Sequence, residues 1–303
     1  MKLKRRHTTI LLMVIFIFGV ALILYPTISD YWNSFHASRA IAGYAEQVSQ
    51  IDTSVSEKVF AEASAYNATL QNKAERFRFT EEDAAVYNKL LNVTGTGIMG
   101  YIDIPSIKVE LPVYHGTDDA VLQIAIGHIE GTSLPVGGKG THSVLSGHRG
   151  LPSAKLFTDI DQLEVGDEFF LQIVDQTLAY EVDQIHIVLP SEMSDLYIDP
   201  EQDYCTLVTC TPYGINTHRL LVRGHRIEFE GKKSRIRVTN EALQISPNVM
   251  AAIFGTIILI FVVIIFYIAT SGRYKEEERA EEEKIEEEKI RSEEELIDYL
   301  LRT

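Results

Sequence analysis

The stretch DYCTLVTCTPYGINTHRLLVRGHR, residues 203–226, is the most informative part of the chain. Residues 204–210, YCTLVTC, alternate in the manner of a strand. This strand is predicted to stop at Pro212, because proline cannot donate to the next bond of a sheet. A second strand opens at Arg219 after the eight-residue loop TPYGINTH. The pattern therefore places Cys210 and Arg219 at the ends of neighbouring strands.

A thiol beside a permanent cation suggests nucleophilic chemistry. The arginine guanidinium keeps its charge at neutral pH, and nearby positive charge lowers the pKa of a thiol and increases its reactivity. Cys205 and Cys210 are separated by an odd interval, so within one strand they point to opposite faces. Cys210 is accordingly predicted to be the nucleophile, and Cys205 a small buried side chain.

The same strand geometry argues against a metal site and against a disulfide between the two cysteines. Zinc with His218 and His225 as further ligands is possible by count, but these histidines are widely spaced for such a site. We therefore expect neither a metal nor a cofactor.

A cysteine nucleophile usually works with a histidine that carries protons. His148 follows an apolar run in HSVLSGHRG, and it lies between two glycines that allow the backbone to turn sharply. His128, in AIGHIEGTSLPVGG, is also flanked by glycine and is the main rival. The local pattern favours His148 but leaves His128 open.

The rest of this region has the texture of a β domain. Short apolar runs separated by Gly and Pro begin after Thr94 and predict seven strands, at 98–104, 107–114, 142–146, 167–174, 177–189, 204–210 and 219–229. Such spacing is typical of a closed barrel or a sandwich. We expect a mainly β domain over residues 95–230.

The residues before this domain are predicted to be helical. Residues 26–94 form an extracellular segment in this interpretation, and 33–92 are rich in Ala, Glu, Gln and Lys, with almost no Gly or Pro. The run Thr80-Glu81-Glu82-Asp83 resembles a capping box and predicts the start of a helix.

Two apolar stretches, residues 8–25 and 249–269, are each long enough to cross a membrane. A cleavable signal peptide is the alternative for the first, but its apolar core is long and no small-residue cleavage site follows closely. Basic residues flank the outer ends of both spans, in segments 1–7 and 270–303. Both termini are therefore predicted to be cytoplasmic, with a connector at 231–248.

The charge of the chain limits its partners. The segment 270–303 carries the near-repeat EEERAEEEKIEEEKIRSEEEL, whose Glu-to-Lys/Arg spacing supports an exposed helix. The tail is interpreted as a solvated helix or a disordered acidic tail rather than as a specific docking site. The whole chain has a formal net charge of −15, so it lacks the excess of Lys and Arg that nucleic-acid binding requires.

Three stretches, AIGHIEGTSLPVGG, HSVLSGHRGLPSAKLFTDIDQL and TLVTCTPYGINTHRLLVRGHR, together resemble the sortase family. The resemblance is closest to class C, the pilin-polymerising sortases of Gram-positive bacteria, and it also covers the two-span arrangement. It implies a closed sortase-type β-barrel of about seven to eight strands. It places the family's catalytic cysteine, histidine and arginine on Cys210, His148 and Arg219. Candidate residues to line the substrate pocket are Thr209, Tyr213 and Asn216.

The resemblance implies a membrane-anchored cysteine transpeptidase. Such an enzyme cleaves an LPXTG-type sorting signal through a thioester on Cys210 and passes the acyl group to a lysine amine of another pilin. Its partners are pilin or surface-protein precursors and the membrane. Two alternatives stay open. A housekeeping-type sortase, which anchors surface proteins to peptidoglycan, would use the same three residues. A non-enzymatic extracellular sensor or binding module would signal through the acidic tail, but leaves the Cys, His and Arg set unexplained.

One segment departs from the class C pattern. These sortases usually have a lid before the barrel, with an Asp-Pro-aromatic motif over the cysteine, and no such tripeptide occurs between residues 40 and 97. Phe77 or Phe79 could replace the aromatic anchor, and Glu75 is the nearest acidic candidate. The expectation is a weakly held or open gate that leaves Cys210 accessible.

Overall fold

The computed structural model describes residues 2–71, 73 and 75–229, and in the C-terminal part residues 255, 258, 261–262, 264–265, 279–280 and 282–292. The chain divides into two compact units, Met1–Val238 and Thr239–Thr303. In the second unit, residues 282–292 are helical, as the charge pattern of the tail predicts. Most of the second predicted span, 249–269, lies outside the described residues, so that span stays a prediction.

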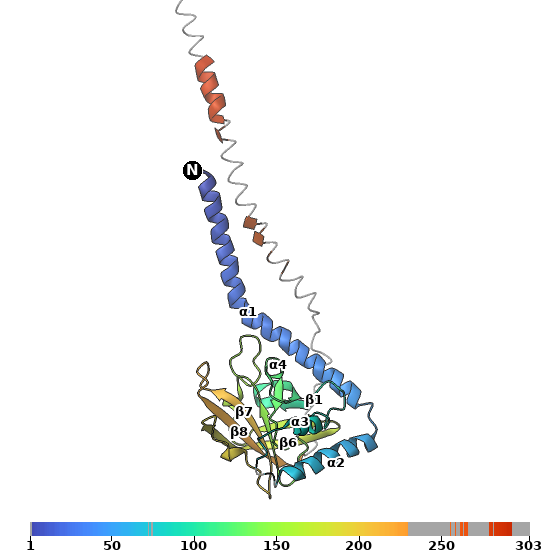
Figure 1. The fold of residues 1–303 in the computed structure, drawn as a ribbon. Helices are drawn as coiled ribbons and strands as arrows, with labels where there is room; N and C mark the ends of the chain where they lie inside the picture. The colour runs from blue at the N-terminus through green and yellow to red at the C-terminus, as the bar shows by residue number, and fades with distance from the viewer. Residues whose placement is uncertain are drawn as a thin grey trace, which may run out of the picture. The chain divides into compact units, whose positions relative to one another are not determined.

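The first unit contains a closed barrel of eight strands (Figure 1). The strands are β1 (Ile98–Ile104), β2 (Val109–His115), β3 (Ile126–His128), β4 (Thr141–Ser146), β5 (Glu168–Ile173), β6 (Gln176–Val188), β7 (Asp203–Thr211) and β8 (His218–Ile227). Their order around the barrel is β1-β2-β3-β4-β7-β8-β6-β5. Pairs β2–β3 and β4–β7 are parallel, and the other neighbours are antiparallel. The mainly β prediction is confirmed.

Alternation along each strand separates the barrel interior from its outer face. On β7, the side chains of Cys205 and Leu207 are fully buried in the main hydrophobic core. Successive side chains of a strand point to opposite faces, so Thr206, Val208 and Cys210 lie on the outer face. The buried position predicted for Cys205 is therefore confirmed.

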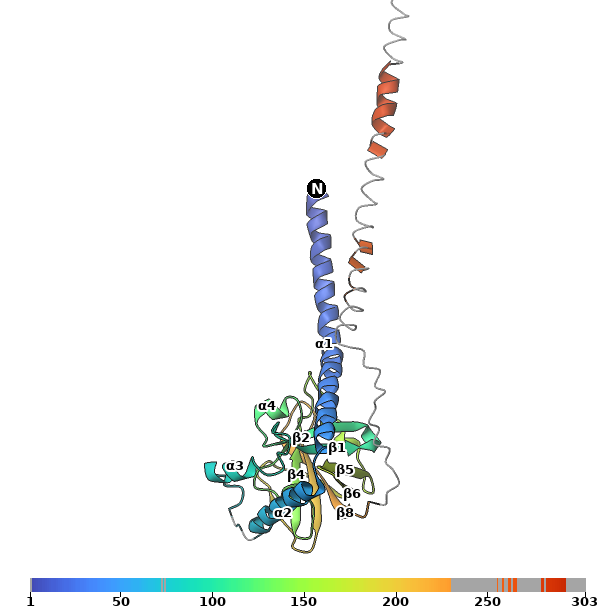
Figure 2. The ribbon, with the colours of Figure 1, turned by 90° about the vertical axis from the view of Figure 1, so that its right-hand side faces the viewer.

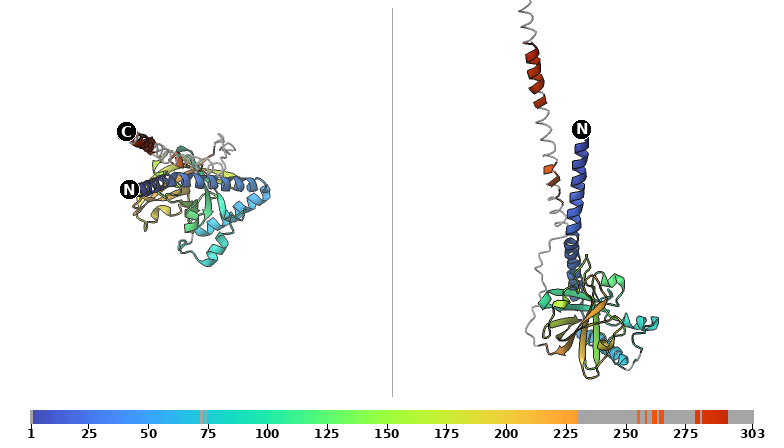
Figure 3. Two further views of the ribbon diagram at one scale, coloured as in Figure 1. Left: turned by 90° about the horizontal axis from the view of Figure 1, so that it is seen from above. Right: turned by 90° about the vertical axis from the view of Figure 1, so that its left-hand side faces the viewer.

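The helices lie before and between the strands. They are α1 (Lys2–Val48), α2 (Thr53–Leu70), α3 (Glu81–Tyr87) and α4 (Asp119–Leu122), with short 3-10 helices η1 (Pro105–Ile107), η2 (Ile160–Gln162) and η3 (Ser194–Leu196). Figures 2 and 3 show α1 running beside the barrel before the chain reverses into α2. The capping box at Thr80 is present, because its hydroxyl accepts from Asp83 N and its own N–H donates to the Asp83 carboxylate.

Helix α1 combines an apolar part with a part that packs on the barrel. Among the described helices it is the one long and apolar enough to cross a membrane, over Ile15–Val48. Pro26 lies inside α1, where proline removes a helical bond and bends the axis, and Figure 1 shows α1 in two parts that meet at an angle. Near its end, Tyr44 donates to Met99 O (2.8 Å) and accepts from Val174 N (2.8 Å). These contacts fix the second part of α1 against β1 and the β5–β6 turn.

Candidate active site

Cys210 and Arg219 face each other across two hydrogen-bonded strands. Cys210 is the penultimate residue of β7, and its partner in the antiparallel ladder with β8 is Arg219. The thiol is free and partly exposed. Arg219 Nη1 donates to the carbonyl oxygens of Asn216 (3.3 Å) and His218 (3.1 Å), so the β7–β8 loop holds the guanidinium at the strand ends. The adjacency expected from the sequence is present.

His148 lies level with Cys210 on the other side of β7. The parallel ladder pairs each residue of β4 with the residue 62 positions later on β7, and it ends at Ser146 and Val208. Beyond that pair, two hydrogen bonds made by side chains join residues with the same separation of 62 positions. Thr209 Oγ1 donates to Gly147 O (2.7 Å), and Arg149 Nη1 donates to Thr211 Oγ1 (3.3 Å). Residue 148, between them, therefore aligns with residue 210.

The three residues form a row across the end of the barrel. They lie on or directly after the neighbouring strands β4, β7 and β8, with Cys210 in the middle. Adjacent strands are about 4.8 Å apart, so the row from His148 to Arg219 spans about 10 Å of backbone. Side chains of this length can reach one reacting group at Cys210 from both sides.

His128 does not belong to this row. It is fully buried, its Nε2 lies 2.8 Å from Ser133 O, and its Nδ1 lies 2.9 Å from the hydroxyl of Tyr87. Because a carbonyl oxygen only accepts, Nε2 carries the proton and Nδ1 accepts from Tyr87. Burial lowers the pKa of His128 to about 4. This histidine is a neutral part of the core, which leaves His148 as the candidate for the proton-carrying histidine.

An apolar cluster lies on the outer face of the barrel beside Cys210. It consists of Val144, Leu196, Val208 and Leu221, and we call it the outer apolar cluster. Val208 is two residues before Cys210 on the same face of β7, which is about 6.6 Å along the strand. An apolar peptide segment that occupied this cluster would therefore have its next residues beside the thiol.

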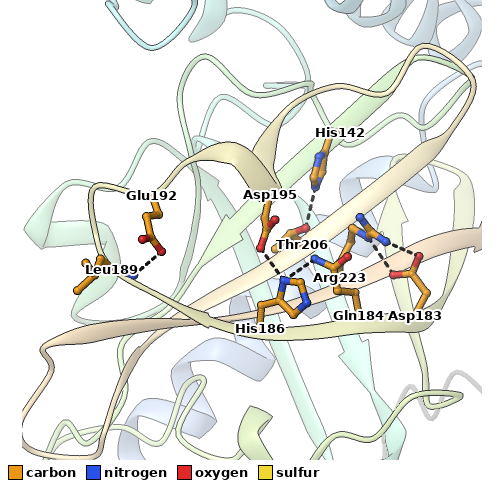
Figure 4. A network of polar contacts seen from close by, with 9 residues as sticks. All are labelled: His142, Asp183, Gln184, His186, Leu189, Glu192, Asp195, Thr206 and Arg223. Atoms are coloured by element: carbon orange, nitrogen blue, oxygen red, sulfur yellow. Dashed lines mark hydrogen bonds and ion pairs between the residues drawn. The ribbon is translucent and has the colours of Figure 1, made fainter.

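The β6–β7 loop, which contributes Leu196 to the cluster, is fixed to the barrel by polar contacts (Figure 4). His186 Nδ1 lies 2.7 Å from Asp195 Oδ2, and Leu189 N donates to Glu192 Oε2 (3.2 Å). His142 is buried beneath the loop, and its Nε2 lies 2.7 Å from Thr206 Oγ1. These contacts keep the wall of the cluster in place.

His142 also binds the loop backbone. Its Nδ1 lies 2.8 Å from Tyr197 O and therefore carries the proton, which leaves Nε2 to accept from Thr206. Burial lowers the pKa of His142 to about 4. The histidine is thus neutral and structural.

The segment before α3 is held more tightly than the sequence suggested. Arg76 is only 5% exposed, and its Nη2 donates to Leu196 O (2.7 Å). Its guanidinium stacks over the ring of Phe77 (4.7 Å), and Phe77 packs against the outer apolar cluster. The expectation of a weakly held segment is therefore wrong at Arg76 and Phe77, because a buried guanidinium provides the anchor. Cys210 itself keeps partial exposure.

Phe79, the other aromatic candidate, has a different place. Its ring meets Tyr87 edge-on at 5.5 Å, and it packs against the main core rather than the outer apolar cluster. Glu75 is exposed and pairs with Arg78 on the surface (3.1 Å). Of the two candidates, Phe77 is thus the one that packs on the outer apolar cluster.

The three predicted pocket residues separate into two groups. Tyr213 is 60% exposed on the β7–β8 loop, and Asn216 is exposed there in the left-handed region (φ 61°). Thr209 is only 2% exposed, because it points to the barrel interior like Cys205 and donates to Gly147 O. As a pocket-lining residue Thr209 is therefore misplaced; it holds the backbone next to His148.

Arg149 was not singled out by the sequence reasoning. Its side chain pairs with Asp161, donates to Thr211 Oγ1 (3.3 Å) and lies over the ring of Tyr213 (6.0 Å). Arg149 directly follows His148 and Thr211 directly follows Cys210. The bond between them therefore links the two strand ends beyond the last pair of the β4–β7 ladder. The sequence carried no specific signal for this role, because an arginine in a glycine-flanked turn usually lies at the surface.

The histidines considered as zinc ligands do not meet. His218 pairs with Thr211 near the row, whereas His225 pairs with Tyr204, about 23 Å away along β8 at about 3.3 Å per residue. Among the residues that the structure describes, no group of three or more His, Cys, Asp or Glu side chains could hold a metal ion.

A partly exposed thiol between an imidazole and a guanidinium, at the end of a β-barrel, is typical of cysteine enzymes that transfer acyl groups. A family model described as Sortase domain matches residues 102–227. The crystal structure of sortase C1 from Streptococcus agalactiae superposes with a TM-score of 0.60 and 50% identity, over 63% of this chain and 98% of that chain. The crystal structure of sortase C from Streptococcus pneumoniae superposes with a TM-score of 0.56 and 44% identity, over 63% of this chain and 97% of that chain.

A curated relative is more distant but spans more of the chain. Sortase A of Bacillus anthracis is 26% identical over 230 residues, which cover 76% of this chain and 99% of that protein. The chain belongs to the sortase family of cysteine transpeptidases, and its solved structural neighbours include class C sortases.

Proposed function

We propose that this chain is a pilin-polymerising class C sortase, a membrane-anchored transpeptidase that joins LPXTG-type sorting signals to a lysine amine of another pilin. The observation that carries the chemistry is the row of His148, Cys210 and Arg219. The class C structures at 50% and 44% identity support the subclass, and the pneumococcal enzyme is one whose structure bears on pilin substrate specificity.

The first half-reaction forms a thioester. The Cys210 thiolate attacks the threonyl carbonyl carbon of the signal, a C–S bond forms, and the carbonyl oxygen becomes an oxyanion. Collapse of this intermediate breaks the bond between Thr and Gly. His148 gives its proton to the departing glycine nitrogen, because an amide anion is too poor a leaving group to depart unprotonated.

Arg219 stabilises the oxyanion in this proposal. Its guanidinium has five N–H donors, and the two bonds to Asn216 and His218 both come from Nη1, so donors remain for a substrate oxygen. The loop carbonyls hold the cation in place before substrate arrives. A donor that is already oriented lowers the barrier more than one that must be recruited.

The second half-reaction releases the product. The amine of an acceptor lysine attacks the thioester carbon, a C–N bond forms, and the C–S bond breaks to return the Cys210 thiolate. Lysine is mostly protonated at neutral pH, so the neutral His148 takes the proton that the amine must lose. The product is an isopeptide between two pilins, and the enzyme returns to its starting protonation.

The outer apolar cluster is the proposed binding site for the Leu and Pro of the signal. It lies on the face of β7 that carries Cys210, so a bound Leu-Pro pair would present the following Thr to the thiol. Phe77 packs there in the substrate-free chain, so the signal must displace it. Tyr213 and Asn216 are proposed to contact the signal from the β7–β8 loop.

Membrane anchoring gives the two partners a common surface. The apolar part of α1 supports one anchor, and the proposed second span, 249–269, would place both termini in the cytoplasm. Holding enzyme and substrates at one membrane raises their effective concentration.

The test of this function is the bond that the product contains. The full chain is incubated with an LPXTG-bearing pilin, and the products are analysed by peptide mass spectrometry. A pilin-polymerising sortase gives an isopeptide to a lysine of a second pilin. Transfer only to an added peptidoglycan cross-bridge amine would identify the housekeeping alternative. Binding without any cleavage would favour the non-enzymatic sensor or binding module.

A further inference from the structure

The loop that follows His148 is hydrogen-bonded to α1. Asn33 Nδ2 donates to Ser153 O (2.7 Å), and Lys155 N donates to Asp30 Oδ1 (2.8 Å). The bonded residues are 120 and 125 positions apart in the chain, so both are tertiary contacts. We call this set of four residues the α1–loop contact.

The two hydrogen bonds lie beside a cavity. A cavity of about 310 Å³ lies between α1 and the loop, and Asp30, Asn33, Lys155 and Asp159 are among its lining residues. Side chains that border a cavity have fewer packing partners, so apolar packing contributes less here than at a filled interface. The two hydrogen bonds therefore form the polar part of the attachment of the loop to α1.

The α1–loop contact lies close to the end of the apolar segment. That segment ends at Tyr25, and Asp30 and Asn33 follow it by about 8 and 12 Å at 1.5 Å per helical residue. Tyr25, Tyr31 and Trp32 are 55%, 43% and 48% exposed in the same turns. Tyr and Trp gather at the boundary between hydrocarbon and water, so these turns have the composition of the headgroup region.

The same loop supports the row. Phe157 N donates to His148 O (3.1 Å), so the stretch from His148 to Phe157 connects the α1–loop contact to the candidate histidine. The opposite end of the barrel is farther along α1. Tyr44, which bonds Val174 N at the β5–β6 turn, is about 21 Å beyond Asp30 along the helix.

We propose that the α1–loop contact docks the catalytic end of the barrel against the lipid headgroups, so that this end, and not the β5–β6 end, faces the bilayer. This proposal depends on one part of the proposed function, namely that α1 is a membrane anchor. Lys108 and Lys155 border the cavity with exposed side chains, but Asp30, Glu110 and Asp159 line it as well, so its charge is mixed and the orientation rests on the α1–loop contact and on the aromatic residues beside it. A sorting signal just outside the membrane then enters the row along the bilayer surface.

The depth of two labels tests this placement. The full chain carrying Cys210→Ser is labelled with a fluorophore through Lys155→Cys, at the loop, or through Gln176→Cys, at the exposed start of β6 on the far end. Each protein is inserted into vesicles that contain headgroup nitroxide lipid. Because the two ends differ by about 20 Å along α1, the Lys155 label should be quenched at least about threefold more than the Gln176 label.

Variants of the contact test its cause. Asp30→Ala with Asn33→Ala should reduce that quenching ratio by about half or more, because both hydrogen bonds to the loop are lost. Ser38→Ala is the matched control, since Ser38 is exposed on the same helix and, among the described residues, its hydroxyl bonds Ser34 O (3.0 Å) and not the loop.

Three results would overturn the proposal. Equal quenching of both labels, or stronger quenching at Gln176, contradicts the orientation, and an unchanged ratio in the double variant contradicts the role of Asp30 and Asn33. A chain that does not float with the vesicles would show that α1 is no anchor. None of these readouts needs turnover, so a failure of the transpeptidase assignment would leave them unaffected.

Discussion

Truncating Phe77 should expose Cys210, because Phe77 packs on the outer apolar cluster beside it. The side chain is half-buried. Full burial of a Phe side chain is worth roughly 1.5–3 kcal/mol, so half burial contributes roughly 0.8–1.5 kcal/mol to the closed arrangement. A difference of about 1.4 kcal/mol is a factor of ten in an equilibrium. Phe77→Ala should therefore raise the rate of Cys210 alkylation by about 4- to 12-fold.

The assay follows iodoacetamide addition to the substrate-free protein by intact mass. Cys205 is fully buried, so the added mass reports on Cys210. Phe79→Ala is the matched control, since its ring packs on Tyr87 and not on the cluster, and it should change the rate by less than about twofold. A Phe77→Ala rate within about twofold of the parent would refute the reasoning and restore the open gate expected from the sequence.

Three further predictions concern the row and the core. Arg219→Lys keeps the charge but loses the planar fork, so kcat/KM should fall by about 5–150-fold (about 1–3 kcal/mol); a fully active variant would show that a point charge suffices. Arg149→Lys should lower kcat by about tenfold and change KM by less than about twofold, because lysine cannot bridge Asp161 and Thr211 together. Arg226→Lys, at the far end of the barrel, is the control. An effect on KM alone would count against a positioning role for Arg149. His128 and His142 have folded-state pKa values lowered to about 4, so below about pH 6.5 the unfolded chain binds more protons and stability falls as pH falls toward 4. Each of the two histidines should lower the free energy of unfolding by about 2 kcal/mol between pH 7 and pH 5, as measured by urea unfolding. Equal stability at the two pH values would contradict this.

Local patterns predicted the parts of the site that local structure determines. Cys210 and Arg219 lie on one hairpin, whose register is limited by its short loop, so their adjacency follows from the sequence. The capping box at Thr80 is equally local. The alternation of β7 also places Thr209 on the face of Cys205, which already argued against a pocket-lining role.

Contacts between distant segments were beyond the same reasoning. His148 is brought level with Cys210 by a parallel pairing of β4 with β7, and sequence spacing does not determine such a register. Strand β3 has only three residues, too few to show alternation. The anchor at Arg76 was missed because an arginine in a polar segment usually lies at the surface, whereas here its guanidinium meets Leu196 O and the ring of Phe77.

The central claim is that Cys210, between His148 and Arg219, forms an acyl-enzyme. The most direct measurement is the intact mass of the protein after mixing with an LPXTG peptide and quenching in acid, followed by peptide mapping. The account predicts a thioester adduct on Cys210 that is absent from Cys210→Ala and present in Cys205→Ala. An adduct that survives in Cys210→Ala, or one that disappears only in a folded Cys205→Ala variant, would contradict it.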